Sequence, residues 1–327
     1  MSRIIGFFQE DNRRLPTLVI GIITILFVLI FLLTFSIWGI TLSMGIVLSV
    51  VALITIFCIV KYPKFGVSFY LFLAYIIMYV LGFGINFPLG TLMDGVLLLL
   101  LISFFISQKT NPNWKIFRNP VSTIILIWIS YNLIQVANPS AESRLSWVYT
   151  IRSVAGVMLS YFIFNYYLSS VGFVRIIVKL WLALSVFAAL YAIKQEYFGF
   201  FDYEQRALDS NPLLQNLLFI NGHWRKSSIF SDPVAFSYNM VASALLCVSL
   251  MLGPTTRKQK VLLGILTVMF LNVMLYSGTR AAYVLFPAAM ALLFIMRFNK
   301  EMLIYFSVFG FFMAVLVYVP SSSPSIQ

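Results

Sequence analysis

Long apolar runs constrain this chain more than any other feature. No charged residue occurs between Arg14 and Lys61, and further apolar runs follow along the rest of the 327-residue sequence. The hydrocarbon core of a bilayer is about 30 Å thick, and about 20 helical residues span it. The first run is too long for one such helix, so we divide it near Ser36 and Gly39. The pattern predicts a chain that crosses a membrane many times.

The composition excludes the other broad classes of protein. Hydrophobic residues make up 61% of the chain and charged residues only 10%, against roughly 25% charged residues in soluble domains. A soluble fold of this size needs more charge on its surface, and a disordered chain has far fewer apolar residues. Transmembrane β-barrels alternate apolar and polar residues instead of forming continuous blocks. We therefore predict an all-α, polytopic helical bundle that forms a single membrane domain over residues 1–327.

The apolar blocks predict about eleven membrane-spanning helices. They cover residues 16–35, 40–60, 65–85, 91–107, 120–137, 153–170, 177–194, 232–252, 260–276, 281–297 and 301–319. If the N-terminus is cytoplasmic, most Lys and Arg residues lie in inner segments and most Asp and Glu residues in outer ones, as the positive-inside rule requires. The net charge of +12 is then an orientation signal and not a sign of nucleic-acid binding. The C-terminus lies outside, and residues 195–231 form the longest extracytoplasmic loop.

Three arginines lie where predicted spans run inward from the outer face. Arg152 begins the span 153–170, Arg225 precedes the span 232–252, and Arg280 begins the span 281–297. Helix N-termini have unpaired N–H groups and a partial positive charge, and guanidinium donors fit phosphate oxygens. If these spans pack together, three arginines and three helix ends form an outer site for a lipid-linked diphosphate. In the alternative interpretation, each arginine reaches the lipid headgroups or pairs with an outer carboxylate.

Further polar residues near Arg225 are candidates for the same site. His223, the only histidine, is a candidate general base because imidazole often exchanges protons near neutral pH; a solvated or structural role is the alternative. Asp232 is predicted to cap a helix that Pro233 begins. Lys226 and Ser277 are predicted supporting residues. Other acidic residues of the long loop are possible acids, bases or ion partners: Asp202, Glu204 and Asp209.

The sequence predicts neither a metal ion nor a cofactor. The two cysteines, Cys58 and Cys247, lie in apolar blocks, where a small packing residue is the usual role. They form neither a disulfide framework nor a metal-ligand pattern. No HExxH motif and no glycine-rich phosphate loop occur.

Two segments resemble motifs of the O-antigen ligase and polymerase superfamily. Residues 222–236 (GHWRKSSIFSDPVAF) resemble its outer-loop-to-helix segment, in which an Arg, a small residue with Phe, and a Pro open a membrane helix. Residues 276–282 (YSGTRAA) resemble its Ser-x-Ser/Thr-Arg-small motif, about two spans later. The resemblance is best over residues 195–320 and covers the first 190 residues only through topology.

The resemblance implies a metal-independent, inverting glycosyltransferase of the bacterial inner membrane. Such enzymes take a glycan from undecaprenyl-diphosphate on the outer face. Ligases pass it to lipid A-core in lipopolysaccharide biosynthesis, and polymerases pass it to a second lipid-linked glycan. The resemblance implies that Arg225 and Arg280, and less closely Arg152, bind the diphosphate leaving group. The expected partners are therefore these lipid-linked glycans, the acceptor and membrane lipids.

The end of the chain departs from the family pattern. Family members continue into a large outer loop with a functionally important His, followed by further spans, whereas this chain stops at Gln327. We therefore expect a ligase-like transferase that lacks the family's C-terminal part. The alternatives are a polymerase of the same family, a transporter or flippase for lipid-linked glycans, and an inactive assembly subunit. No charge lies clearly in mid-span and no repeat is evident, which favours the transferase over the transporter.

Overall fold

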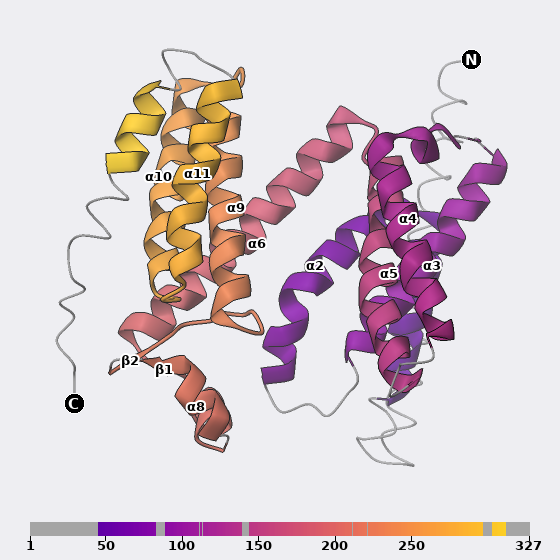
Figure 1. The fold of residues 1–327 in the computed structure, drawn as a ribbon, viewed down its shortest axis with the longest axis horizontal. Coiled ribbons are helices and arrows are strands. Elements are labelled where there is room, and N and C mark those ends of the chain that lie inside the picture. Colours follow the sequence, from indigo (N-terminus) through magenta and orange to yellow (C-terminus); the bar gives the residue numbers. More distant parts are fainter. Residues whose placement is uncertain are drawn as a thin grey trace, which may run out of the picture. The chain divides into compact units, whose positions relative to one another are not determined.

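The structure is a computed structural model that describes residues 45–82, 89–110, 112, 114–138, 144–210, 212–220, 222–296 and 303–311. The chain forms two compact units, residues 1–63 and 64–327. In the first unit the described residues form the helix Gly45–Lys61. The residues that bear on function lie in the second unit, which is almost entirely helical (Figure 1).

The elements follow one another as a series of helices with one short hairpin. They are α2 (Pro63–Gly82), α3 (Leu89–Thr110), η1 (Trp114–Arg118), α4 (Pro120–Ile134), η2 (Gln135–Ala137), α5 (Arg144–Tyr167), α6 (Val171–Tyr197), α7 (Asp202–Asp209), α8 (Pro212–Leu218), β1 (Phe219–Ile220), β2 (His223–Trp224), α9 (Pro233–Met251), α10 (Arg257–Leu275) and α11 (Arg280–Met296). Residues 303–311 are also helical. The two strands pair antiparallel, with Phe219 opposite Trp224 and Ile220 opposite His223.

The helices agree with the predicted all-α bundle and fit a membrane protein by their length and composition. Among the described residues, seven helices are long and apolar enough to cross a membrane, and Gly45–Lys61 and α11 are shorter apolar helices. The total of eleven spans and the orientation of the termini stay predictions. The predicted span 16–35 lies outside the described residues.

α9 begins where the sequence indicates, at a capped end. The Asp232 carboxylate accepts hydrogen bonds from the backbone N–H groups of Val234 and Ala235, at 2.8 Å each. Pro233 occupies the first helical position, where its missing N–H costs nothing. The Phe236 N–H donates to the Asp232 carbonyl at 3.2 Å. Every N–H group in the first turn of α9 is therefore satisfied.

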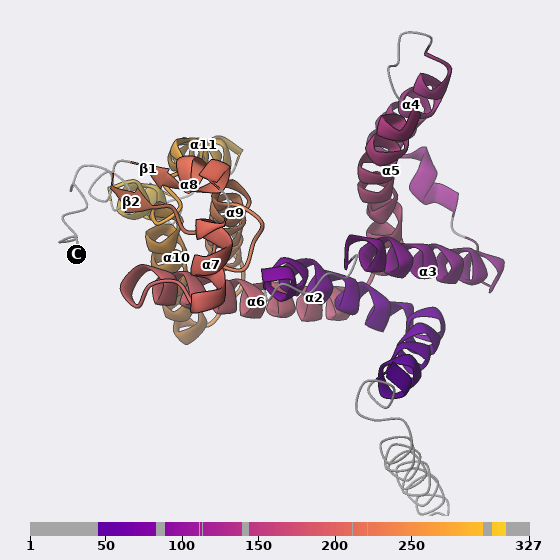
Figure 2. The same cartoon turned by 90° about the horizontal axis from the view of Figure 1, so that it is seen from below.

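α9 is the central helix of a bundle in which it packs against α6, α10 and α11. The ribbons of α9, α10 and α11 run side by side (Figures 1 and 2). Large side chains at their contacts are fully buried, among them Phe236, Phe270 and Phe286. Small polar residues let α9 and α6 approach closely, and the hydroxyls of Ser185 and Ser243 lie 2.8 Å apart between them. This packing fixes where α9 and α11 begin.

The α3–α5 segment has its own contacts. α5 packs against both α3 and α4. The indole N–H of Trp147 on α5 donates to the backbone carbonyl of Asn132 on α4 at 2.8 Å. The rings of Phe117 and Phe162 stack with centroids 4.9 Å apart. These contacts determine the surroundings of Arg152, which lies in α5.

Candidate functional site

Three segments that are distant in the sequence meet at one end of the α9–α11 bundle. The Lys226 N–H donates to the Tyr276 carbonyl at 2.9 Å, which joins the loop after β2 to the turn between α10 and α11. The Thr279 hydroxyl is 3.4 Å from the Pro233 carbonyl, which joins that turn to the start of α9. Figure 2 shows the hairpin and α8 over this end of the bundle. The two motifs of the sequence analysis therefore lie together in the fold.

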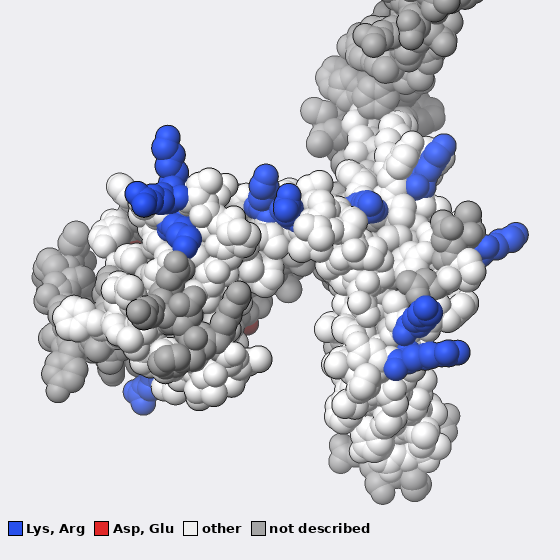
Figure 3. All heavy atoms as spheres, turned by 90° about the horizontal axis from the view of Figure 1, so that it is seen from above, with Lys and Arg blue, Asp and Glu red and all other residues white. Residues whose placement is uncertain are grey.

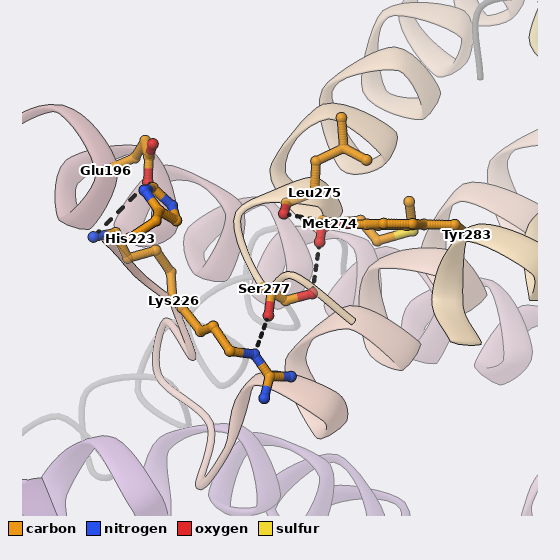
Figure 4. Close-up of polar contacts among 8 residues, drawn as sticks. Glu196, His223, Lys226, Met274, Leu275, Ser277 and Tyr283 are labelled. Carbon is orange, nitrogen blue, oxygen red and sulfur yellow. Dashed lines mark hydrogen bonds and ion pairs between the residues drawn. The ribbon is translucent and has the colours of Figure 1, made fainter. Parts of the chain in front are cut away.

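Arg225 is held against the α10–α11 turn. Its Nε donates to the Ser277 carbonyl at 2.7 Å (Figure 4), and its Nη2 donates to the Thr279 hydroxyl at 3.2 Å. Gly278 has a φ of 61°, in the left-handed region, and a Cβ there would lie 3.5 Å from Arg225 Cγ. An arginine has five N–H donors, so these two bonds orient the guanidinium and leave three donors for a ligand.

Arg225 and Arg280 line the same cavity. It has a volume of about 490 Å³ and is lined by Ile220, His223, Arg225, Gly278, Thr279, Arg280 and Tyr283. Arg280 is exposed, and among the described residues it makes no hydrogen bond or ion pair. The cavity therefore has a pre-oriented guanidinium on one wall and an unneutralised guanidinium on another, an arrangement that suits an anion with several oxygens.

The cap of α9 changes one expectation. The sequence analysis predicted that the N-terminus of this helix would help to bind an anion. That prediction is wrong, because Asp232 already accepts the N–H groups of Val234 and Ala235. Burial alone would raise the pKa of the Asp232 carboxyl, but hydrogen bonds from Ala235, Ser231 and Val234 and the charge of Arg225 bring that pKa below its ordinary value. Asp232 is therefore a structural anion beside Arg225.

Arg152 is not among the residues that line the cavity. It forms an ion pair with Asp94 of α3, its Nε meeting the carboxylate. α5 packs against α3 and α4, and Asp94 lies in the second turn of α3, within reach of the Arg152 side chain. The structure thus brings two of the three predicted arginines together and leaves the third paired with a carboxylate.

Glu196, His223 and Lys226 form an acid–base cluster (Figure 4), of which His223 also lines the cavity. Glu196 Oε2 lies 3.6 Å from His223 Nε2 and 3.8 Å from Lys226 Nζ. The Glu196 and Lys226 side chains are only 14% and 8% exposed. Burial lowers the pKa of Lys226, and the charges of Glu196 and Glu204 partly offset that effect. The ammonium group also lies 4.6 Å from the centre of the Phe200 ring.

The sequence analysis missed Glu196, and its predicted supporting residues have different surroundings. Glu196 lies in the last turn of α6, and its only signal was an acidic residue where a span meets the long loop. Lys226 points to Glu196, whereas Ser277 is fully buried and its carbonyl holds Arg225. The Ser277 hydroxyl donates to the Met274 carbonyl at 2.7 Å. Ser277 thus shapes the turn that carries Arg225.

Comparisons of the chain with family models, with curated proteins and with solved structures found no match. The resemblance to the O-antigen ligase and polymerase superfamily therefore stays a prediction that rests on the motifs at residues 222–236 and 276–282. Among the described residues, no group of three or more His, Cys, Asp or Glu side chains is arranged to hold a metal ion.

Proposed function

We propose that the protein is an O-antigen ligase-like glycosyltransferase that moves a glycan from undecaprenyl-diphosphate to an acceptor on the outer face of the bacterial inner membrane. Arg225 and Arg280 bind the diphosphate. The observation that carries this proposal is that both guanidinium groups line one cavity at the end of a bundle of membrane helices. Arginine suits this task because its fork of donors matches phosphate oxygens.

The position of the cavity along the helices supports binding of a lipid. α10 has 19 residues, which extend about 28 Å at about 1.5 Å per residue. Arg257 and Lys258 are exposed where α10 begins, and its other end meets the cavity. Figure 3 shows the molecule from the side that lies away from the cavity. Lys and Arg side chains project from that end of the helices. The positive-inside rule favours a cytoplasmic position for that end, and this supports a diphosphate site at the outer interface.

The proposed chemistry is one displacement at the anomeric carbon. An acceptor hydroxyl attacks this carbon from the face opposite the diphosphate, so the configuration inverts. The bond between the anomeric carbon and the phosphate oxygen breaks, and the diphosphate leaves with the electron pair. Arg225 and Arg280 stabilise the charge that grows on the leaving group. A general base must take the proton of the attacking hydroxyl, and His223 stays the candidate that the sequence predicts for this role.

Substitution of the two arginines tests the proposal. We expect Arg225→Ala and Arg280→Ala each to abolish glycan transfer in cells while the protein still inserts into the membrane. Lys replacements should restore little activity, because an ammonium group cannot make the two-point contact. Arg206→Ala is the matched control, since Arg206 is exposed on α7 and does not line the cavity. Normal transfer by both Ala variants would overturn the proposal.

The outer location is tested separately with impermeant thiol reagents. In a chain without Cys58 and Cys247, we expect cysteines in place of Gln205 and Ser322 to react from outside the cell. A cysteine in place of Lys258, at the other end of α10 from the cavity, should react only after the membrane is opened. Labelling in the opposite pattern would reverse the proposed orientation.

A further inference from the structure

We infer that a second cavity, separated from the first by Arg225, binds the sugar ring that is joined directly to the diphosphate. This inference rests on the proposed function and adds a subsite for a neutral monosaccharide. The cavity lies between the end of α2, the residues after α6, and the loop that precedes α9. Its volume is about 230 Å³, and Arg225 lines it as well as the first cavity.

Because Arg225 lines both cavities, it limits what the second cavity can hold. In a lipid-linked glycan the first sugar is bonded to the diphosphate, so its ring must lie next to the phosphate site. Arg225 is the residue that both cavities have in common, and a diphosphate bound to it places the attached ring beside the second cavity. The volume of this cavity, about 230 Å³, suits a single ring.

The lining chemistry fits a ligand rich in hydroxyl groups. Aromatic side chains from α2 and from the α6–α7 region line the cavity, namely Tyr79, Phe200 and Tyr203. A sugar ring presents C–H groups on its faces and hydroxyls at its edge, so it can contact aromatic and polar side chains together. The charges in the lining balance, since Arg225 is its one cation and Glu204 its one anion. Such a cavity favours a neutral ring over a second phosphate.

Glu204 is positioned to accept a hydrogen bond from the sugar. Its Oε1 accepts from the Tyr191 hydroxyl at 2.9 Å and from Gln195 Nε2 at 2.8 Å. Its Oε2 accepts from the Phe201 N–H at 2.7 Å. A carboxylate has about four acceptor positions, so three bonds fix this group in place and one position on Oε2 stays open to a hydroxyl donor.

Ser227 supplies a second polar group in the lining of the cavity. Its side chain lines the cavity, and its hydroxyl makes no hydrogen bond with the described residues. A sugar hydroxyl in the cavity would satisfy it, and a larger apolar side chain at this position would occupy the same space.

A binding experiment with two probes separates this inference from the proposed function. The full chain in lipid nanodiscs is titrated with undecaprenyl-diphosphate and with undecaprenyl-diphosphate that carries one N-acetylglucosamine. We expect the wild type to bind the sugar-bearing lipid about tenfold more tightly, the effect of about one hydrogen bond to a charged group. Glu204→Gln and Ser227→Leu should each remove this preference and leave the affinity for the sugar-free lipid unchanged.

The controls distinguish the possible failures. Asp209→Asn should change neither affinity, because Asp209 is exposed on α7 and its hydrogen bond from Gln205 can persist. Arg280→Ala should weaken binding of both lipids by a similar factor. A wild type that binds the two lipids equally, or a preference that survives in both Glu204→Gln and Ser227→Leu, overturns the sugar subsite but leaves the diphosphate site. A wild type that binds neither lipid overturns both.

The variants also need a test of folding, because Glu204 has three hydrogen-bond partners in the structure. Thermal unfolding of each variant in the same nanodiscs provides it. If Glu204→Gln fails to fold, Ser227→Leu alone decides the inference, since no hydrogen bond from the Ser227 side chain to the described residues is lost. Retention of the tenfold preference by a folded Ser227→Leu protein then overturns it.

Discussion

Arg152 in α5 and Arg280 at the start of α11 are both arginines, but their surroundings differ. Arg152 meets the carboxylate of Asp94, so its charge is neutralised within the protein. Arg280 makes no ion pair among the described residues and shares a cavity with Arg225. An arginine near the end of a membrane helix is therefore available to an anionic ligand only where it is not paired with a carboxylate. The position of the nearest acidic side chain decides this, and packing sets that position.

The largest expected difference between the two regions is in diphosphate binding. Arg225→Ala should weaken binding of undecaprenyl-diphosphate by about tenfold to a hundredfold, because hydrogen bonds to a charged group contribute about 1.5–3 kcal/mol. Arg152→Ala should change the affinity less than about twofold. Titration of both variants in nanodiscs measures the two effects, and equal losses would contradict the distinction between the regions.

The glycines that lie beside Arg152 and Arg225 give the next contrast. A Cβ at Gly90 would lie 3.2 Å from Arg152 Nη2, the far end of a flexible side chain, whereas Gly278 has a φ of 61°. Gly278→Ala should lower the free energy of unfolding by about 1–2 kcal/mol, because a Cβ strains the left-handed conformation. Gly90→Ala should have little effect, because the arginine can move aside. Denaturant unfolding in detergent compares them, and a larger loss for Gly90→Ala would contradict this account.

The cap of α9 predicts a pH-dependent effect of about 1 kcal/mol. Asp232→Ala should destabilise the protein by that amount at neutral pH, since it removes the acceptor for two N–H groups. The pKa of Asp232 is lowered in the fold from 3.8, so the unfolded chain binds more protons between the folded pKa and 3.8. The stabilisation by the ionised carboxylate is therefore complete above about pH 4 and is lost as the pH falls through the folded pKa.

Unfolding curves at several pH values check this prediction. The difference in stability between the wild type and Asp232→Ala should shrink in acid. Asp232→Asn serves as the control, because Asn keeps a side-chain acceptor for the cap without the charge. A difference between wild type and Asp232→Ala that is constant from neutral pH to strong acid would contradict the role of the charge.

The smallest expected effect is on the stability that the α5 pair contributes. The side chains of Arg152 and Asp94 are 40% and 46% exposed, and ion pairs at the surface contribute about 0–1 kcal/mol. A double-mutant cycle with Arg152→Ala and Asp94→Ala should give a coupling energy below about 1 kcal/mol that decreases with added salt. A coupling of several kcal/mol would show that this pair, too, has a special role.

Much of the fold followed from local patterns. The predicted spans 232–252, 260–276 and 281–297 agree within a few residues with α9, α10 and α11. The cap at Asp232 was also predicted correctly, because it depends on residues adjacent in the sequence. The partners of the candidate site were less accessible. Glu196, for example, meets Lys226 only because the loop after β2 is held to the turn at Tyr276.

By itself, the amino-acid sequence determined that this chain is a membrane protein built from helices, because burial of long apolar runs in a bilayer requires each segment to satisfy its own backbone hydrogen bonds. It also marked Arg225, which precedes a helix, and Arg280, which begins one. The tertiary structure alone decided that these two arginines share a cavity while Arg152 pairs with Asp94. The reason is that charge neutralisation depends on distances of a few ångströms between residues far apart in the chain, and helix packing sets those distances.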